Sequence, residues 1–147
     1  MSELQVVVFS LNGQLFGVEA LQVFQIIKYQ ELSKSKKMLP FIDGVISHMD
    51  DRALPVINLA RRFQMENYEP SRKSKILVIN LGEKLAGFIV DDVTEIVRFD
   101  ESEVEPAPVI TSNEAKSYIT KVGKRGEKLI SIIDFMKVLT GDELSKL

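Results

Sequence analysis

The sequence predicts an all-β protein made of two small barrels that share one hydrophobic seam. Three observations support this prediction: the chain repeats itself, each repeat opens with the signals of a β-hairpin, and the helical stretches are brief. The chain has 147 residues, of which 45% are hydrophobic and 27% are charged. That is the size of one ordinary domain or of two very small ones.

The internal repeat emerges when the sequence is shifted so that residues 11–29 lie over residues 81–99. Identical residues meet at five positions: Leu11, Leu15, Gly17, Val23 and Ile26 match Leu81, Leu85, Gly87, Val93 and Ile96. A second block places residues 55–63 over 131–139. We therefore expect two copies, at 5–68 and 75–147, which pack against each other because each is too small to bury much core alone. Terminal strands are free to cross between the barrels.

Each copy opens with a predicted hairpin. In the first, Asn12-Gly13 lies between two apolar runs and supplies the positive φ angles of a type I′ turn. In the second, residues 82–84 (GEK) take this place and indicate a slightly different loop. After each hairpin, residues 20–27 and 90–97 carry apolar side chains at spacings of three and four. This pattern fits a helical turn followed by an extended stretch, and it leaves the choice between helix and strand open.

Each copy then ends in a β-branched strand, at 54–57 or 129–133, followed by a residue that caps helices well, Asn58 or Asp134. We expect a brief helix after Asn58. A longer one after Asp134 should run until Gly141 interrupts it. The polar stretch 67–74 is the natural connector between the copies.

The composition excludes several kinds of chemistry. The chain has no Cys and a single His, which removes disulfide scaffolds, thiolate zinc sites, thiol nucleophiles and His-rich metal sites. A formal net charge of −2 argues against nucleic-acid binding. The first residues lack the features of a signal peptide, and no run reaches the ~18 apolar residues of a membrane span. We therefore expect a cytoplasmic protein that does not insert into a membrane.

The polar clusters favour solvated turns over catalytic sites. His48 stands beside Asp50 and Asp51, but three adjacent ligands rarely surround one metal ion. The pair Asp91-Asp92 lies where the chain turns out of a strand, with no pocket partners evident in the sequence. Nucleotide-binding and nucleophile-elbow motifs are absent. We predict no catalytic residues, no metal and no cofactor, and we keep a ligand- or metal-responsive regulator acting through residues 47–52 as an alternative.

An apolar surplus remains in the repeated element. Its members are Val23, Phe24, Ile26 and Ile27 in the first copy and Val93, Ile96 and Val97 in the second. Most should be core, because apolar residues at such spacing usually face inward. Those that reach the surface near the seam would form an apolar groove for a helix of another protein. The sequence thus favours binding over chemistry.

Several segments, in their order and spacing, resemble the CheW family of chemotaxis coupling proteins over residues 6–139. They are VVFSLNGQLFGVEALQVFQII, LPFIDGV followed by ALPVINLARRF, GFIVDDVTEIV, EPAPVI and YITKVGKRGEKLISIIDFMKVL. The resemblance implies a single CheW-like domain over 1–147 with two SH3-like five-stranded β-barrel subdomains, short helices and a C-terminal helix. It also implies an adaptor without catalysis, which couples the cytoplasmic tip of methyl-accepting chemoreceptors to the regulatory domain of the histidine kinase CheA.

Family roles carried over by position implicate two sets of residues. The resemblance places Val23, Ile26 and Ile96 in a receptor-binding groove between the subdomains. Phe41 and Gly44 fall in a stretch implicated in docking to the kinase. Receptor identity, the sign of kinase control and the oligomeric state do not follow from the sequence.

The chain departs from the family pattern in one loop. Where the family usually reads GVINLRG, residues 44–50 read GVISHMD, so Met49 stands in place of the motif's Arg. The Glu that commonly pairs with this Arg is Gln25 here, and the loop is one residue longer. We hypothesise a divergent coupling protein whose receptor-side contact, including Gln25 and Met49, is changed. A kinase-binding array scaffold without normal receptor coupling is the alternative.

Overall fold

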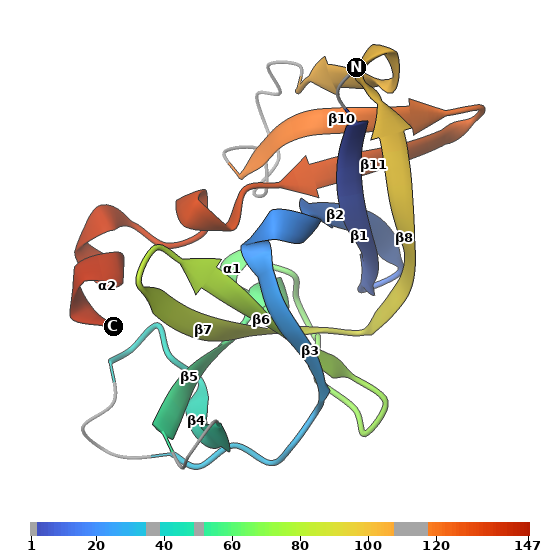
Figure 1. Cartoon of the computed structure of the whole chain (residues 1–147). Coiled ribbons are helices and arrows are strands. Elements are labelled where there is room, and N and C mark those ends of the chain that lie inside the picture. Colours follow the sequence, from blue (N-terminus) through green and yellow to red (C-terminus); the bar gives the residue numbers. More distant parts are fainter. Residues whose placement is uncertain (1–2, 35–38, 49–51, 108–117) are drawn as a thin grey trace.

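The computed structural model describes residues 3–34, 39–48, 52–107 and 118–147 (Figure 1). The strands are β1 (Glu3–Leu11), β2 (Gln14–Glu19), β3 (Val23–Lys28), β4 (Gly44–His48), β5 (Arg52–Asn58), β6 (Lys75–Leu81), β7 (Lys84–Val90), β8 (Asp92–Asp100), β9 (Val104–Pro106), β10 (Ile119–Arg125) and β11 (Lys128–Ile133). Two short α-helices, α1 (Leu59–Arg62) and α2 (Gly141–Lys146), accompany the 3₁₀ turns η1 (Ala20–Gln22), η2 (Glu101–Glu103) and η3 (Phe135–Lys137). None of the helices in these ranges is of a length and hydropathy that would cross a bilayer.

The strands form two sheets, which we call barrel A and barrel B. Barrel A has the strand order β8-β1-β2-β11-β10-β9, and barrel B has the order β3-β6-β7-β5-β4. Neighbouring strands are antiparallel except at β2–β11 and β5–β7, which are parallel. The all-β, two-barrel prediction is confirmed, with the short strand β9 as a sixth member of barrel A.

Two strands cross from one barrel to the other. Strand β3 follows the β1–β2 hairpin of barrel A in the chain but pairs with β6 in barrel B. Strand β8 follows the β6–β7 hairpin of barrel B but pairs with β1 in barrel A. Figure 1 shows these two strands, blue and yellow, spanning the region between the sheets. Each barrel is consequently built from strands of both halves of the sequence.

The turn chemistry explains the hairpins. Asn12 and Gly13 have φ angles of 50° and 81° and connect β1 to β2 as a two-residue loop, as expected for type I′. In the second copy, Gly82 has a φ of 71°, and the loop again contains two residues because Leu81 pairs directly with Lys84. Both predicted hairpins are present, but the second loop consists of residues 82–83 only, because Lys84 already belongs to β7.

The ambiguous stretch 20–27 begins with the 3₁₀ turn η1 and continues as β3, whereas the stretch 90–97 has no helical turn and forms the end of β7 and most of β8. Both β3 and β8 contain a β-bulge. The pairing of β3 with β6 shifts between Val23 and Gln25, which leaves Phe24 as the extra residue. The pairing of β8 with β1 shifts in the same way, with Thr94 as the extra residue. At a bulge, two residues of one strand lie opposite a single residue of the partner strand, so the regular alternation of side chains slips by one position there. Residues three apart, such as Val23 and Ile26, can therefore lie on one face of a strand.

The hydrophobic core has three parts, which follow from strand alternation. In β1, Val6 and Val8 point into barrel A, while Val7 and Phe9 point into the region between the barrels. In β6, Ile76 and Val78 likewise fill barrel B, and their neighbours face the same central region. This central cluster, the seam, joins strands of both barrels to α1 and η3. The predicted hydrophobic seam is confirmed.

The chain after Asp134 differs from its prediction. The Asn58 and Asp134 side chains accept hydrogen bonds from the N–H groups of Arg61 and Met136, so both predicted caps are present. After Asp134, however, the chain forms only the 3₁₀ turn η3, and Gly141 begins the helix α2 instead of ending a longer one. The reason is the Thr140 hydroxyl, which accepts the Glu143 N–H and starts a new helix.

Candidate functional site

The interbarrel surface is the apolar surface formed by Val23 and Ile26 of β3 with Val93 and Ile96 of β8. The sequence repeat makes these residues equivalent in pairs. Ile26 pairs with Leu77 of β6, and Ile96 pairs with Val7 of β1. Because Leu77 and Val7 both belong to the seam, the two isoleucines lie on the seam-facing sides of their strands.

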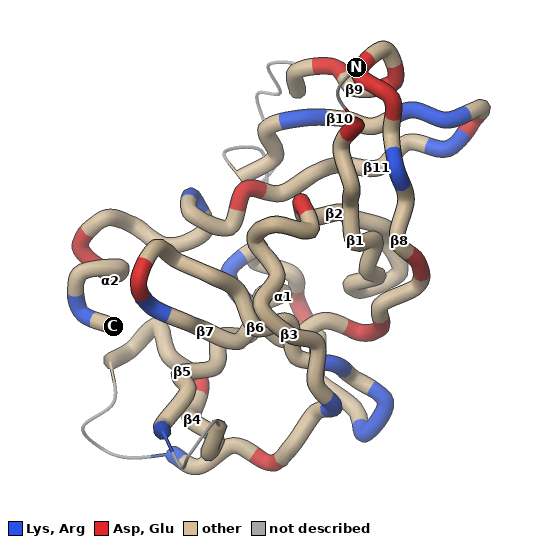
Figure 2. The backbone as a smooth tube through the Cα atoms, viewed as in Figure 1, with Lys and Arg blue, Asp and Glu red and all other residues tan. Residues whose placement is uncertain are grey.

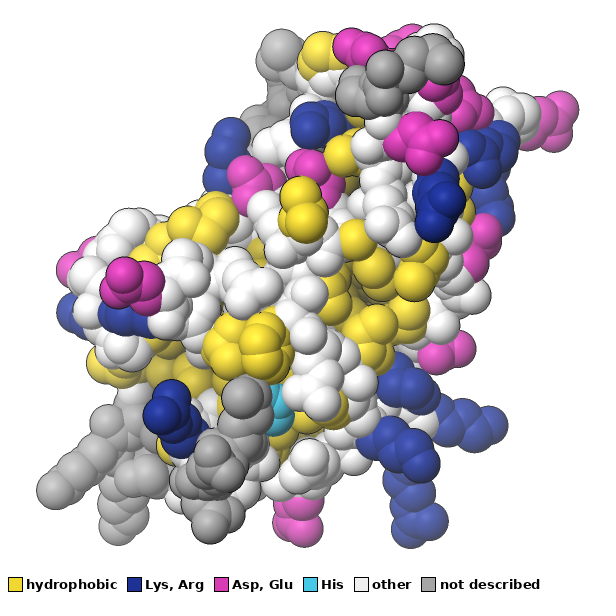
Figure 3. Space-filling model, in the orientation of Figure 1, with side chains coloured by type: hydrophobic (Ala, Val, Ile, Leu, Met, Phe, Trp, Pro, Cys, Tyr) yellow, Lys and Arg dark blue, Asp and Glu magenta, His cyan; other side chains and the backbone are white. Residues whose placement is uncertain are grey.

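Exposure separates this surface into a floor and two projecting residues. Val23 and Val93 are partly buried against the seam. Ile26 and Ile96 remain 39% and 58% exposed. Figure 3 shows hydrophobic side chains gathered between the two barrels in the region of β3 and β8. Large exposed aliphatic residues beside a partly buried apolar floor are typical of a protein-binding surface.

Gln25 forms a hydrogen bond that links the two edge strands of barrel B. The Gln25 Oε1 lies 2.7 Å from Nε2 of His48, at the end of β4. The Phe24 ring meets the His48 ring edge-on, with the centroids 6.3 Å apart. Since β3 and β4 are the outermost strands of the sheet, this contact helps to close the barrel. Met49 lies outside the described residues.

Barrel A is closed by charged residues at the corresponding place. Glu95, the repeat equivalent of Gln25, forms an ion pair with Lys128 of β11 at 3.0 Å. Arg125 forms an ion pair with Glu103 at 3.0 Å and donates to the Arg98 carbonyl. The Arg125 guanidinium holds the pKa of the Glu103 carboxyl below its usual value. Ion pairs thus help to close barrel A, whereas a hydrogen bond between Gln25 and His48 helps to close barrel B.

Sequence reasoning missed the role of His48. We assigned His48 to a solvated loop and considered only Met49 as the counterpart of Gln25. The structure places His48 at the end of a strand, facing Gln25 across the barrel opening. The signal was present in the one-residue insertion, which shifts every position of the loop relative to the family motif.

The two residues assigned to kinase docking occupy different environments. Gly44 is buried in β4, where an added Cβ would overlap the Cβ of Leu32 and lie 3.1 Å from the Ser33 carbonyl oxygen. Packing therefore accounts for the glycine, which offers no side chain to a partner. Phe41 is half-buried against the seam and lines an open pocket.

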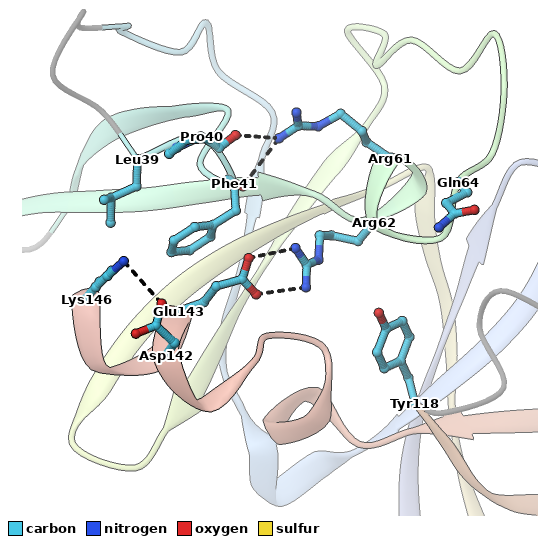
Figure 4. A pocket seen from close by; sticks show the side chains of 10 residues that line it. All are labelled: Leu39, Pro40, Phe41, Arg61, Arg62, Gln64, Tyr118, Asp142, Glu143 and Lys146. Atoms are coloured by element: carbon cyan, nitrogen blue, oxygen red, sulfur yellow. Dashed lines mark hydrogen bonds and ion pairs between the residues drawn. The ribbon is translucent and has the colours of Figure 1, made fainter.

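The pocket beside Phe41 is formed by both halves of the chain and by α2 (Figure 4). Arg62 of α1 holds both carboxylate oxygens of Glu143, at 2.9 and 3.0 Å. Burial alone would raise the pKa of Glu143, but the Thr140 N–H and the Arg62 guanidinium together lower it. Arg61 is likewise paired with Asp43 at 3.0 Å. These pairs hold α2 and residues 39–43, which we call the Phe41 segment, against the barrels.

The carboxylate pair Asp91-Asp92 has a structural role. Asp91 accepts the Tyr68 hydroxyl at 2.5 Å and the Asn12 N–H at 2.7 Å, so it ties the connector to the first hairpin. Burial and the hydrogen bond to Asp91 raise the pKa of Tyr68. Among the described residues, no group of three acidic, His or Cys side chains could hold a metal ion. Asp50 and Asp51 lie outside these residues.

The fold and this surface define a double-barrel binding module with an apolar contact surface between its barrels. A family model described as the CheW-like domain matches residues 5–143. The chain therefore belongs to the CheW family, a family of chemotaxis adaptor proteins.

Relatives in several bacteria match most of the length of this chain. The chemotaxis protein CheW of Bacillus subtilis is 30% identical over 92% of this chain and 86% of its own. The CheW protein of Klebsiella aerogenes is 25% identical over 94% of this chain and 82% of its own. The crystal structure of the scaffolding protein CheW from Thermoanaerobacter tengcongensis matches with a TM-score of 0.82 and 29% identity. That match covers 97% of this chain and 92% of the other.

Proposed function

We propose that this protein is a cytoplasmic adaptor that binds the regulatory domain of the histidine kinase CheA and the cytoplasmic tip of a chemoreceptor. The observation that carries the receptor contact is the pair Ile26 and Ile96. These two repeat-equivalent isoleucines remain exposed at 39% and 58% although they lie on the seam-facing sides of their strands.

The interbarrel surface suits a helical partner. Two isoleucines project from different strands above a floor formed by Val23 and Val93. A helix that lies between them can present apolar residues spaced three or four apart to both at once. The receptor tip, a helical hairpin in the family, has this geometry.

The strand exchange supports a coupling mechanism by rigid docking. Strands β3 and β8 each pair within one barrel and are joined in the chain to the other barrel. A partner bound to both strands is therefore connected to both barrels through the protein backbone. The seam below is a packed core, and such cores transmit displacements with little deformation. A change in receptor conformation can then bias the active and inactive states of a bound kinase.

We propose that the Phe41 segment contacts the kinase and that Gly44 makes no direct contact with it. Phe41 lies at the rim of an open pocket, and the pairs Arg61–Asp43 and Arg62–Glu143 hold that region in place. Gly44 serves this contact only indirectly, because its compact packing on Leu32 positions the strand that follows the segment.

A calorimetric titration with a receptor-tip fragment from the same organism tests the proposal. Ile96→Asp should weaken binding by at least about tenfold, since it places a charge on an apolar contact. Leu129→Asp is the matched control, because Leu129 is an aliphatic residue of β11 with nearly the same exposure, 59% against 58% for Ile96. Equal affinities of the two variants, or no binding by the wild-type chain, would refute the receptor contact.

A second candidate function is favoured by the hydrogen-bonded pair Gln25–His48, which stands where the family has Glu and Arg. If the changed barrel opening prevents receptor binding, the protein would act as an array scaffold that binds the kinase only. Titration with the regulatory domain of the kinase separates the two cases. Kinase binding without receptor binding indicates the scaffold, and binding of both indicates the adaptor.

A further inference from the structure

We propose that a basic cluster at one end of the interbarrel surface binds acidic side chains of the helix that occupies this surface. The cluster consists of Lys28, Arg72, Lys73 and Lys75, which line one open depression of about 610 Å³ with Ser71, Asp91 and Asp92. Figure 2 shows these basic residues gathered where β3 ends and β6 begins. The inference rests on the proposed receptor contact and adds the chemistry of the partner.

The cluster is continuous with the apolar residues. Lys28 follows Ile26 by two positions on β3, so both side chains lie on the same face of the strand. The pairing of Lys28 with Lys75 and of Ile26 with Leu77 places the two lysines next to each other on that face. A helix long enough to extend beyond Ile26 would therefore meet the cations. In Figure 3 the dark blue side chains border the yellow surface between the barrels.

The basic charges are poorly compensated within the protein. Lys75 has one long ion pair, with Asp92 at 3.8 Å. No ion pair to Lys28, Arg72 or Lys73 occurs in the described parts of the chain. The nearby Asp91 carboxylate is engaged by Tyr68 and by a backbone N–H.

The arrangement also costs stability. Like charges directly opposite each other on neighbouring strands are destabilising, and Lys28 stands opposite Lys75. A protein with a formal net charge of −2 concentrates four cations at this place. An anionic partner would relieve their repulsion and speed the encounter with the apolar surface.

The chemistry favours carboxylates on a protein over phosphate. Three of the four cations are lysines, which act as point charges, and a single arginine offers little of the bidentate geometry that selects phosphate. Because the cluster borders an apolar surface, the matching partner is an amphipathic helix with Asp or Glu beyond its apolar face.

The substitution Lys28→Glu tests this inference through two measurements that should move in opposite directions. It replaces a like-charged cross-strand pair by an ion pair with Lys75, so the Tm should rise by roughly 1–4 °C. The affinity for the receptor-tip fragment should fall about fivefold or more at ~50 mM salt, and this loss should shrink at ~500 mM salt. Substituting a residue with a purely structural role would not raise the Tm and lower the affinity at the same time.

Lys73→Glu provides a second variant and Lys137→Glu the matched control. Lys73 is exposed in the cluster, whereas Lys137 is an exposed lysine of η3, outside both the cluster and the interbarrel surface. We expect Lys73→Glu to weaken binding and Lys137→Glu to leave it unchanged.

The outcomes distinguish this inference from the function on which it rests. If the wild-type chain binds, Ile96→Asp weakens binding as expected, and Lys28→Glu and Lys73→Glu bind as the control does, the basic cluster has no role and the receptor contact stands. If the wild-type chain does not bind the fragment at any salt concentration, both the receptor contact and this inference are overturned.

Discussion

The substitution Gly44→Ala should destabilise the protein strongly without removing any contact to a partner. An alanine Cβ at this position overlaps the Cβ of Leu32, an atom that no rotamer change can move away. The segment that contains Leu32 and Ser33 must shift instead. Ser33 forms two backbone hydrogen bonds of 2.9 Å with Val45, which help to close barrel B.

The expected magnitude follows from these two effects. Overpacking a close contact costs about 1–3 kcal/mol. Weakening two backbone hydrogen bonds adds a contribution of roughly 0.5–1.5 kcal/mol for each bond lost. We therefore expect the free energy of unfolding to fall by about 2–4 kcal/mol and the Tm to fall by roughly 5–15 °C.

Thermal and urea unfolding measure this loss, and two further variants sharpen the result. Gly141→Ala makes the same chemical change where no atom lies within 4 Å of the added Cβ, so it should be nearly neutral. Leu32→Gly removes the obstructing Cβ. In that background Gly44→Ala should cost less than about 1 kcal/mol, because the two positions are directly coupled.

Two results would refute the reasoning. One is a Gly44→Ala protein that unfolds at the wild-type temperature, which would mean that the barrel absorbs the extra methyl group. The other is a Gly44→Ala protein that is fully folded at the assay temperature but fails to bind the kinase regulatory domain. Gly44 would then belong to the docking surface itself.

Three further predictions concern ionisable groups. Because the folded state lowers the pKa of Glu143, its carboxylate stabilises the protein above the unfolded-state value and loses this effect as the pH falls through the folded value. Urea unfolding of Glu143→Gln should therefore show a deficit of about 1–2 kcal/mol near neutral pH that disappears in acid. Because the folded state raises the pKa of Tyr68, wild-type stability should fall as the pH rises above about 10, and that of Tyr68→Phe should fall less. Gln25→Glu places a carboxylate within hydrogen-bond distance of His48, and because hydrogen bonds to a charged acceptor are stronger than neutral ones, thermal unfolding should show a higher Tm than for the wild-type chain.

Local patterns predicted the parts of the fold that local chemistry determines. Asn12-Gly13 specifies a tight turn by backbone sterics, and Asn58 and Asp134 are caps because their side chains reach the next N–H groups. The prediction failed at Gly141, where the cap formed by Thr140 began a helix at a residue that more often ends one.

Non-local pairing explains what the sequence left open. The spacing of three between Val23 and Ile26 suggested a helical turn, but it arises from a bulge in the pairing of β3 with β6. A bulge depends on the partner strand, and a local sequence pattern does not identify which strand that is. The same limit applies to His48, whose contact with Gln25 exists only because β3 and β4 are the two edges of one barrel.

The β1–β2 hairpin pairs with strands of the second half and the β6–β7 hairpin with strands of the first, which gives the chain the topology of a domain-swapped homodimer whose subunits have been joined end to end. A cut in the connector at 67–74 would leave two fragments, neither of which holds the strands of a complete barrel. In this arrangement Ile26 and Ile96 occupy equivalent positions in the two repeats. A partner that contacts both isoleucines would therefore meet one kind of contact twice, once in each repeat.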